Sequence, residues 1–250
     1  MPVALITGAS SGLGAEFVEA VIQTAPDITE IWLVARRLDR LEAIAAAHPE
    51  RAIRCITTDL GDESGLTELT ATLDQEHPDI SLLINNAGVI QPGKFRSVDP
   101  SALRAQILLD AAAPMTVTRA CLPHMNRGAT IINVGSVSGF APVKNQVVYA
   151  ASKSFLYEFS LGLRAELTSA GINVLVMCPG NMRTEMDAGI TPDGGIGEWL
   201  PYLDLTTITR EAIRRARAGH AVYTPHPVYR GYQLLAKLLP HQLVARYASR

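Results

Sequence analysis

The glycine-rich turn near the start of the chain reads TGASSGLG (residues 7–14) and joins an apolar run to a segment of helical period. Gly8 lets the chain turn sharply, while Gly12 and Gly14 let the backbone approach a pyrophosphate and the helix pack closely on the strand. The helix N-terminus then offers free N–H groups to phosphates. An ordinary strand-to-helix loop can look the same. The turn predicts a dinucleotide site that uses Gly8, Ser10, Ser11, Gly12, Leu13 and Gly14.

Short apolar runs alternate with helical segments along the rest of the chain. The runs are residues 3–7, 31–35, 52–57, 80–84, 130–134 and 172–178, with a weaker one at 221–224. Most are almost continuous in apolar residues, as strands covered on both faces are. Strand–helix alternation indicates a parallel sheet with right-handed crossovers. We predict an α/β fold: a three-layer, doubly wound Rossmann-type sheet of about seven strands in one domain, residues 1–250.

Composition narrows the class of protein. Of the 250 residues, 48% are hydrophobic and 18% charged, enough apolar material for a sizeable core. A net charge of −2 gives no basic face for nucleic acid. Neither the three cysteines nor the six histidines are spaced as metal ligands. No apolar stretch reaches the roughly 18 residues of a membrane span, and no signal peptide is recognisable, so we expect a cytoplasmic protein.

Two arginines follow the second apolar run. A site for an unphosphorylated adenine ribose usually has an acidic residue there, but this chain has Arg36 and Arg37. Guanidinium groups pair well with a phosphate dianion. The pair therefore predicts NADP(H) rather than NAD(H), although two solvated charges at the start of a helix would look the same.

Further motifs occur in a fixed order. They are DL at 59–60, NNAG at 85–88, Ser136, Tyr149 with Lys153, and PGNMRT at 179–184. With the glycine-rich turn, this order and spacing resemble the short-chain dehydrogenase/reductase family, classical type, over essentially the whole chain. The resemblance implies a homodimer or homotetramer that acts on a small carbonyl or alcohol substrate.

The resemblance also implies cofactor contacts. Asp59 and Leu60 would lie against the adenine. Asn86, Ala87 and Gly88 would line its ribose and support the central strand, although Asn85 and Asn86 also suit a polar strand end. The nicotinamide would be held by Pro179, Gly180, Met182 and Thr184.

Tyr149 and Lys153 are four residues apart and so share one face of a helix. A phenol has a pKa of about 10, which a nearby ammonium lowers toward a useful range for acid/base catalysis. Ser136, at the end of the fifth run, would orient the substrate oxygen, and the resemblance adds a bond from Lys153 to the nicotinamide ribose. The set predicts hydride transfer between nicotinamide and a carbonyl or secondary alcohol. The alternative is a helix with an exposed tyrosine and lysine.

Asp110 departs from the family pattern, which usually has an active-site asparagine there. An ionised carboxylate brings charge near Lys153 and cannot donate a hydrogen bond. In one interpretation, the aspartate impairs the site or moves its pH optimum. In the other, the important group is a backbone carbonyl that holds a water molecule of the proton relay. Pro114 lacks the N–H that would bond the carbonyl of residue 110, so we expect a kink and a free carbonyl. The alternative is a proline with only local effect.

Two regions are candidates for substrate recognition. Residues 185–205 are rich in glycine and proline and follow the sixth run, as a substrate loop would. The tail, residues 225–250, is apolar on one side and basic on the other. It fits a helix docked on its own domain or a partner subunit, or a cover for an apolar substrate or a membrane surface.

Three functions remain open at this point. The leading one is an NADP(H)-dependent carbonyl reductase or alcohol dehydrogenase with an apolar substrate. A sugar-nucleotide epimerase usually needs a larger C-terminal region than this chain has after Thr184. A cofactor-binding sensor or scaffold with little turnover is supported only by Asp110.

Overall fold

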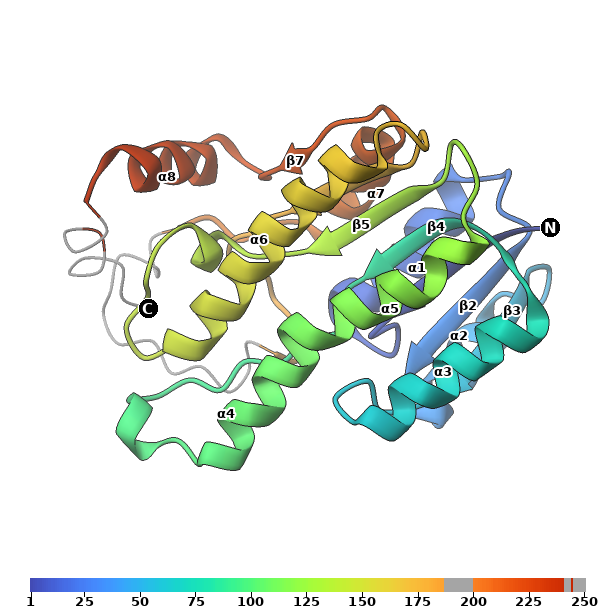
Figure 1. Cartoon of the computed structure of the whole chain (residues 1–250), viewed down its shortest axis with the longest axis horizontal. Coiled ribbons are helices and arrows are strands. Elements are labelled where there is room, and N and C mark those ends of the chain that lie inside the picture. Colours follow the sequence, from blue (N-terminus) through green and yellow to red (C-terminus); the bar gives the residue numbers. More distant parts are fainter. Residues whose placement is uncertain (187–199, 241–243, 245–250) are drawn as a thin grey trace.

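A parallel sheet forms the centre of the molecule (Figure 1). The computed structural model describes residues 1–186, 200–240 and 244. Within them the sheet order is β3-β2-β1-β4-β5-β6-β7, and every pairing is parallel. The strands are β1 (Pro2–Thr7), β2 (Glu30–Ala35), β3 (Ala52–Thr57), β4 (Asp79–Asn85), β5 (Thr130–Val134), β6 (Asn173–Met177) and β7 (Val222–Tyr223). The predicted seven-stranded parallel sheet is confirmed.

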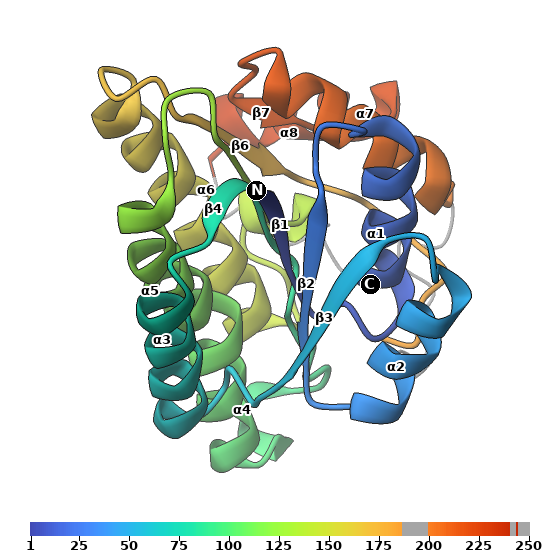
Figure 2. The same ribbon diagram turned by 90° about the vertical axis from the view of Figure 1, so that its right-hand side faces the viewer.

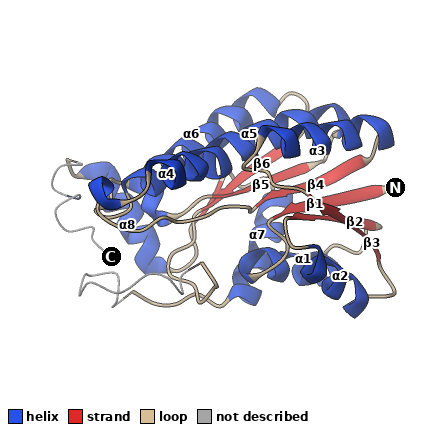
Figure 3. Cartoon of the chain, turned by 90° about the horizontal axis from the view of Figure 1, so that it is seen from below, coloured by secondary structure: helices blue, strands red, loops and turns tan. Residues whose placement is uncertain are grey.

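Helices cover both faces of the sheet. One layer holds α3, α4, α5 and α6 and the other holds α1, α2 and α7, as Figures 2 and 3 show from two directions. Their bounds are α1 (Gly12–Thr24), α2 (Leu38–Ala47), α3 (Glu63–Glu76), α4 (Pro100–Ile107), α5 (Ala113–Cys121), α6 (Val147–Leu167), α7 (Leu205–Arg217) and α8 (Pro227–Leu238). Short helical turns are η1 (Phe95–Ser97), η2 (Leu108–Ala112), η3 (Leu122–His124) and η4 (Val137–Phe140). The three-layer, doubly wound arrangement is therefore as predicted.

The sheet separates the two largest apolar clusters of the core. Leu5 of β1 packs with the cluster on the α3 and α5 side, whereas its neighbour Ile6 packs with the cluster on the α1 and α7 side. Successive side chains of a strand point to opposite faces, so a strand covered on both faces needs apolar residues at every position. This explains why the strands appear in the sequence as continuous apolar runs.

A buried polar chain ties the central strands to the helices above them. Asn85 Nδ2 donates to Thr118 Oγ1 (2.9 Å) and to Asn133 Oδ1 (2.8 Å). Asn133 Nδ2 in turn donates to Ser160 Oγ at 2.9 Å. These bonds link β4, α5, β5 and α6 without exposing a polar group, so they fix the strand ends next to which the site lies.

Among the described helices, none combines the length and the apolar character that crossing a membrane requires.

Candidate active site

A cleft of about 510 Å³ opens at the carboxyl ends of the strands. It lies where the chain changes direction across the sheet, between β1 and β4, which is where ligands bind in open α/β sheets. It brings together these predicted residues: Gly8, Ser10, Ser11, Gly12, Leu13, Arg36, Arg37, Asp59, Leu60, Asn86, Ala87, Gly88, Ser136, Tyr149, Lys153, Pro179, Gly180, Met182 and Thr184. Two predicted residues, Gly14 and Asp110, are not part of its lining.

The glycine-rich turn closes one wall of the cleft. Gly8 and Gly12 have φ angles of 66° and 53°, in the region that favours glycine. A Cβ at Gly14 would lie 2.0 Å from the Gly8 carbonyl oxygen, so only glycine lets α1 pack this closely on the turn. Gly14 therefore allows α1 to pack against the turn, although it does not itself line the cleft.

Hydrogen bonds join the segment after β4 to the glycine-rich turn. Asn86 Nδ2 donates to the carbonyl oxygens of Thr7 (3.1 Å) and Gly8 (3.2 Å). Thr7 Oγ1 accepts from the backbone N–H groups of Asn86 (3.0 Å) and Ala87 (3.1 Å). Asn86 therefore holds two walls of the cleft together, beside any contact with a ligand.

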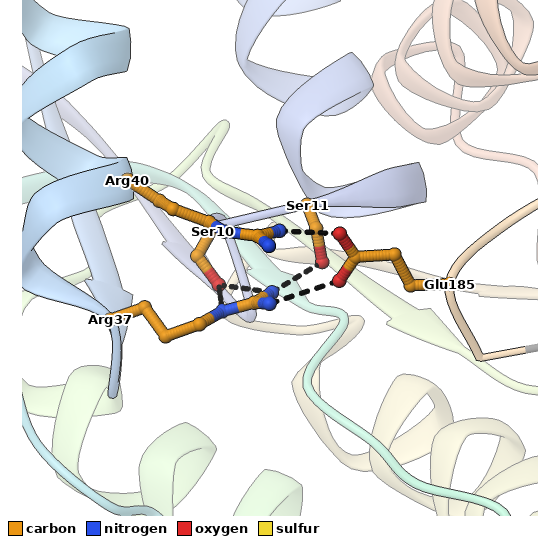
Figure 4. Close-up of polar contacts among 5 residues, drawn as sticks. All are labelled: Ser10, Ser11, Arg37, Arg40 and Glu185. Atoms are coloured by element: carbon orange, nitrogen blue, oxygen red, sulfur yellow. Dashed lines mark hydrogen bonds and ion pairs between the residues drawn. The ribbon is translucent and has the colours of Figure 1, made fainter.

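Arg37 lies at the end of the cleft beside the glycine-rich turn (Figure 4). Its guanidinium donates to Ser10 Oγ (3.1 and 3.2 Å) and to Ser11 Oγ (2.7 Å), and so spans the glycine-rich turn. Arg36 is largely exposed, with Nη1 3.5 Å from Asp59 Oδ2. Two guanidiniums and two hydroxyls at this end form a donor set suited to a phosphate.

The three predicted catalytic residues, Ser136, Tyr149 and Lys153, also line the cleft. Tyr149 and Lys153 are both buried in α6, and Lys153 Nζ lies 5.7 Å from the centre of the Tyr149 ring. Nζ donates to the Val134 carbonyl oxygen at 3.0 Å, which fixes the ammonium at the end of β5. Ser136 caps η4 by accepting from the Ser138 N–H at 3.1 Å. The three side chains that the family resemblance singled out thus line one cleft.

Asp110 lies behind this wall in a widened helical turn. Residues Leu108–Ala112 form a π turn, η2, in which the Ala113 N–H bonds the Leu108 carbonyl five residues back, and the kink expected from Pro114 stays a prediction. The Asp110 side chain is completely buried, and its Oδ1 accepts from the Val89 N–H at 2.8 Å. Burial raises the pKa of this carboxyl, and the Lys153 ammonium opposes that shift. The side chain therefore supports the turn after β4; a role for the Asp110 carbonyl in a proton relay stays a prediction.

Gly88 lies next to both the Asp110 carboxyl and the Lys153 ammonium. A Cβ there would lie 3.0 Å from Asp110 Oδ1 and 3.4 Å from Lys153 Nζ. The position therefore needs a residue without a side chain if the carboxyl and the ammonium are to approach one another.

The turn after β6 forms the remaining wall and depends on a residue that sequence reasoning missed. Tyr229 of α8 is fully buried; its hydroxyl accepts from the Asn181 N–H (2.9 Å) and donates to the Pro201 carbonyl oxygen (2.7 Å). Leu203 N–H bonds the Asn181 carbonyl oxygen at 2.8 Å. The tail predicted at 225–250 thus begins with a helix that braces the cleft.

Parts of the two candidate recognition regions lie outside the described residues. Of the predicted substrate loop at 185–205, residues 187–199 are not described, and neither are residues 241–243 and 245–250 of the tail. Glu185 and Met186, the described beginning of the loop, line the cleft. Over the described part of the chain, no cluster of three or more His, Cys, Asp or Glu side chains is arranged to hold a metal ion.

Fold and cleft together define a nucleotide-binding α/β protein of the doubly wound type. A sequence model described as short chain dehydrogenase matches residues 2–194. The chain belongs to the short-chain dehydrogenase family, and its activity class is that of an oxidoreductase.

Individual proteins support this assignment. Sulfoacetaldehyde reductase of Chromohalobacter salexigens is 32% identical over 226 residues, which are 88% of each chain. A short-chain dehydrogenase from Sphingobium yanoikuyae, solved in complex with NADPH, superposes with a TM-score of 0.81 at 31% identity and covers 95% of this chain and 94% of its own. The bulky-bulky ketone specific alcohol dehydrogenase from Comamonas testosteroni gives 0.77 at 28% identity, with coverages of 95% and 92%.

Proposed function

We propose that this protein is an NADP(H)-dependent oxidoreductase that transfers a hydride between the nicotinamide and a carbonyl or secondary alcohol. The observation that carries the proposal is that Ser136, Tyr149 and Lys153 converge in the same cleft as the glycine-rich turn and Arg37. An aldehyde reductase and a ketone-specific alcohol dehydrogenase among the similar proteins support the reaction class.

The residues of the cleft fit a phosphorylated dinucleotide. The turn at residues 8–13 would take the pyrophosphate, and Arg36 and Arg37 the 2′-phosphate of the adenine ribose. The segment 179–184 would hold the nicotinamide. The bound cofactor supplies or accepts the hydride.

Residues of the chain itself would transfer the proton and orient the substrate. In reduction, the Tyr149 hydroxyl donates its proton to the substrate oxygen while the carbonyl carbon receives the hydride; in oxidation Tyr149 takes the proton back. The Lys153 ammonium stabilises negative charge on the phenol oxygen. Ser136 Oγ orients the substrate oxygen so that the carbonyl carbon faces the nicotinamide.

Substrate character and assembly belong to the same proposal. Apolar side chains line part of the cleft, among them Ile90, Leu109 and Met182, which supports an apolar substrate. A second copy of the chain would cover apolar residues that α4 to α6 leave exposed, including Ile107, Met115 and Phe155, as a homodimer or homotetramer in the cytoplasm.

Replacing Tyr149 by phenylalanine tests the proposal. Tyr149→Phe should bind NADPH as the unaltered chain does, followed by fluorescence titration, and lose activity about a hundredfold or more with a panel of ketones and aldehydes. Tyr157→Phe is the matched control, because Tyr157 lies two turns further along α6 and outside the cleft. Near-unaltered turnover by Tyr149→Phe would refute the assignment.

A cofactor-binding sensor or scaffold is the second candidate, favoured by the buried Asp110 carboxyl beside Lys153. Tight NADPH binding by the unaltered chain without oxidation across the panel would support it.

A further inference from the structure

A carboxylate lies among the arginines at the end of the cleft beside the glycine-rich turn. Glu185 Oε2 is 2.9 Å from Arg37 Nη1, and Oε1 is 2.5 Å from Arg40 Nη1 (Figure 4). Hydrogen bonds from two arginines lower the pKa of Glu185 to about 2, and the bond from Arg40 has a larger effect than the bond from Arg37. The side chain therefore carries a full negative charge at neutral pH.

Glu185 reaches this place from a distant part of the chain. It follows β6 and comes directly after Thr184. A Cβ added to Gly12 would lie 3.3 Å from the Cβ of Thr184. The segment thus crosses over the glycine-rich turn, and Glu185 lines the cleft beside Arg37. Its side chain is 55% exposed, so solvent and solutes reach the carboxylate.

Carboxylates and phosphates use the same N–H groups of a guanidinium. The N–H groups of Arg37 are shared among Ser10, Ser11 and Glu185. A 2′-phosphate bound at Arg37 would meet the Glu185 charge directly and would need the same donor. A dinucleotide without that phosphate meets no such competition.

We propose that Glu185 is an internal competitor of the 2′-phosphate, and that its hold on Arg37 and Arg40 limits the preference of this protein for NADP(H) over NAD(H). The inference rests on the proposed function, since it assumes that Arg37 receives the phosphate. Glu185 would then be a specificity-determining residue. It lies outside the position at the end of β2 that usually determines the choice of cofactor.

A purely structural role for Glu185 makes the opposite prediction. If its ion pairs only anchored the segment to α2, removing them would loosen the wall that carries Thr184. Both dinucleotides would then bind more weakly, to a similar degree. Competition instead predicts a gain that is confined to ligands with a 2′-phosphate.

Isothermal titration with fragments of the adenosine half separates these effects without any need for turnover. The probes are 2′,5′-ADP, which carries the 2′-phosphate, and 5′-AMP, which lacks it. Glu185→Gln should bind 2′,5′-ADP about three- to tenfold more tightly, the range expected when exposed ion pairs no longer compete, and 5′-AMP within about twofold. Glu185→Ala repeats the test independently, and thermal melting shows whether each variant is folded.

Asp39→Asn is the matched control. Asp39 is an exposed residue in the first turn of α2, next to Arg40, and its replacement changes the net charge by the same amount. Affinity for 2′,5′-ADP should change less in this variant than in Glu185→Gln.

The outcomes are distinguishable. Unchanged or weaker binding of 2′,5′-ADP by Glu185→Gln, or an equal gain in Asp39→Asn, overturns the inference while the proposed function stands. Failure of the unaltered chain to bind NADP⁺ or 2′,5′-ADP overturns the proposed function, and the inference falls with it.

Discussion

Removing one hydroxyl from α8 should weaken the wall of the cleft that the turn after β6 forms. Tyr229→Phe deletes the bonds to the Asn181 N–H and the Pro201 carbonyl oxygen but keeps the ring. The ring itself is packed tightly, because a Cβ at Gly180 would lie 1.9 Å from Tyr229 Cζ. The substitution therefore isolates the two hydrogen bonds from the packing.

The magnitude follows from those bonds. Each contributes about 0.5–1.5 kcal/mol, so the free energy of unfolding should fall by about 2 kcal/mol. In a chain of this length that lowers Tm by about 4–8 °C. NADPH should also bind more weakly, because Pro179 and Gly180 line the cleft next to the loosened turn.

Thermal unfolding followed by circular dichroism, with NADPH titration beside it, measures both effects. Tyr232→Phe is the control, since it removes the same atom from the same helix, and the Tyr232 hydroxyl has no hydrogen bond to any of the residues that the structure describes. A Tm for Tyr229→Phe within about 1 °C of the unaltered chain would refute the bracing role of Tyr229.

Three further predictions concern the turn, the buried carboxyl and the thiols. Gly14→Ala should abolish NADPH binding or destabilise the chain by about 1–3 kcal/mol or more, because its Cβ would meet the Gly8 carbonyl; Gly162→Ala, at an open helical position, should stabilise it by about 0.5–1 kcal/mol, and equal melting of both variants would contradict this. Burial raises the pKa of Asp110 above its ordinary 3.8, so the protonated form stabilises the fold at low pH and this contribution is lost as pH rises through the raised pKa. In urea denaturation, Asp110→Asn should therefore gain stability relative to the unaltered chain as the pH rises above the ordinary pKa of 3.8, and a difference that does not change with pH would mean that Lys153 keeps the carboxyl ionised throughout. A thiol reagent should modify only the half-buried Cys55 of the native protein, since burial raises the pKa of Cys121 to about 12 and also that of Cys178; three thiols reacting before unfolding would contradict the structure.

The features that the sequence predicted are those set by local pattern. Strands covered on both faces need apolar residues at each position, so β1 to β6 were recognisable as runs. The glycine-rich turn and the Tyr149–Lys153 spacing follow from geometry over a few residues. Even β7, only two residues long, left a weak signal.

The features that could not be predicted depend on tertiary placement. Glu185 and Arg37 are separated by 148 positions, and nothing in either local sequence indicates that they meet. Tyr229 looks like one apolar residue of an amphipathic helix until the fold places it against Gly180. The partner of Asp110, the Val89 N–H, is fixed by the π turn and the end of β4, neither of which is visible in the sequence around Asp110.

The most direct test of the account is NADPH oxidation, followed at the nicotinamide absorbance band with a panel of ketones, aldehydes and quinones, with NADH in parallel. The account predicts that at least one carbonyl compound is reduced and that NADPH is used at lower concentrations than NADH. Absence of oxidation across the panel, or equal use of the two dinucleotides, would contradict it.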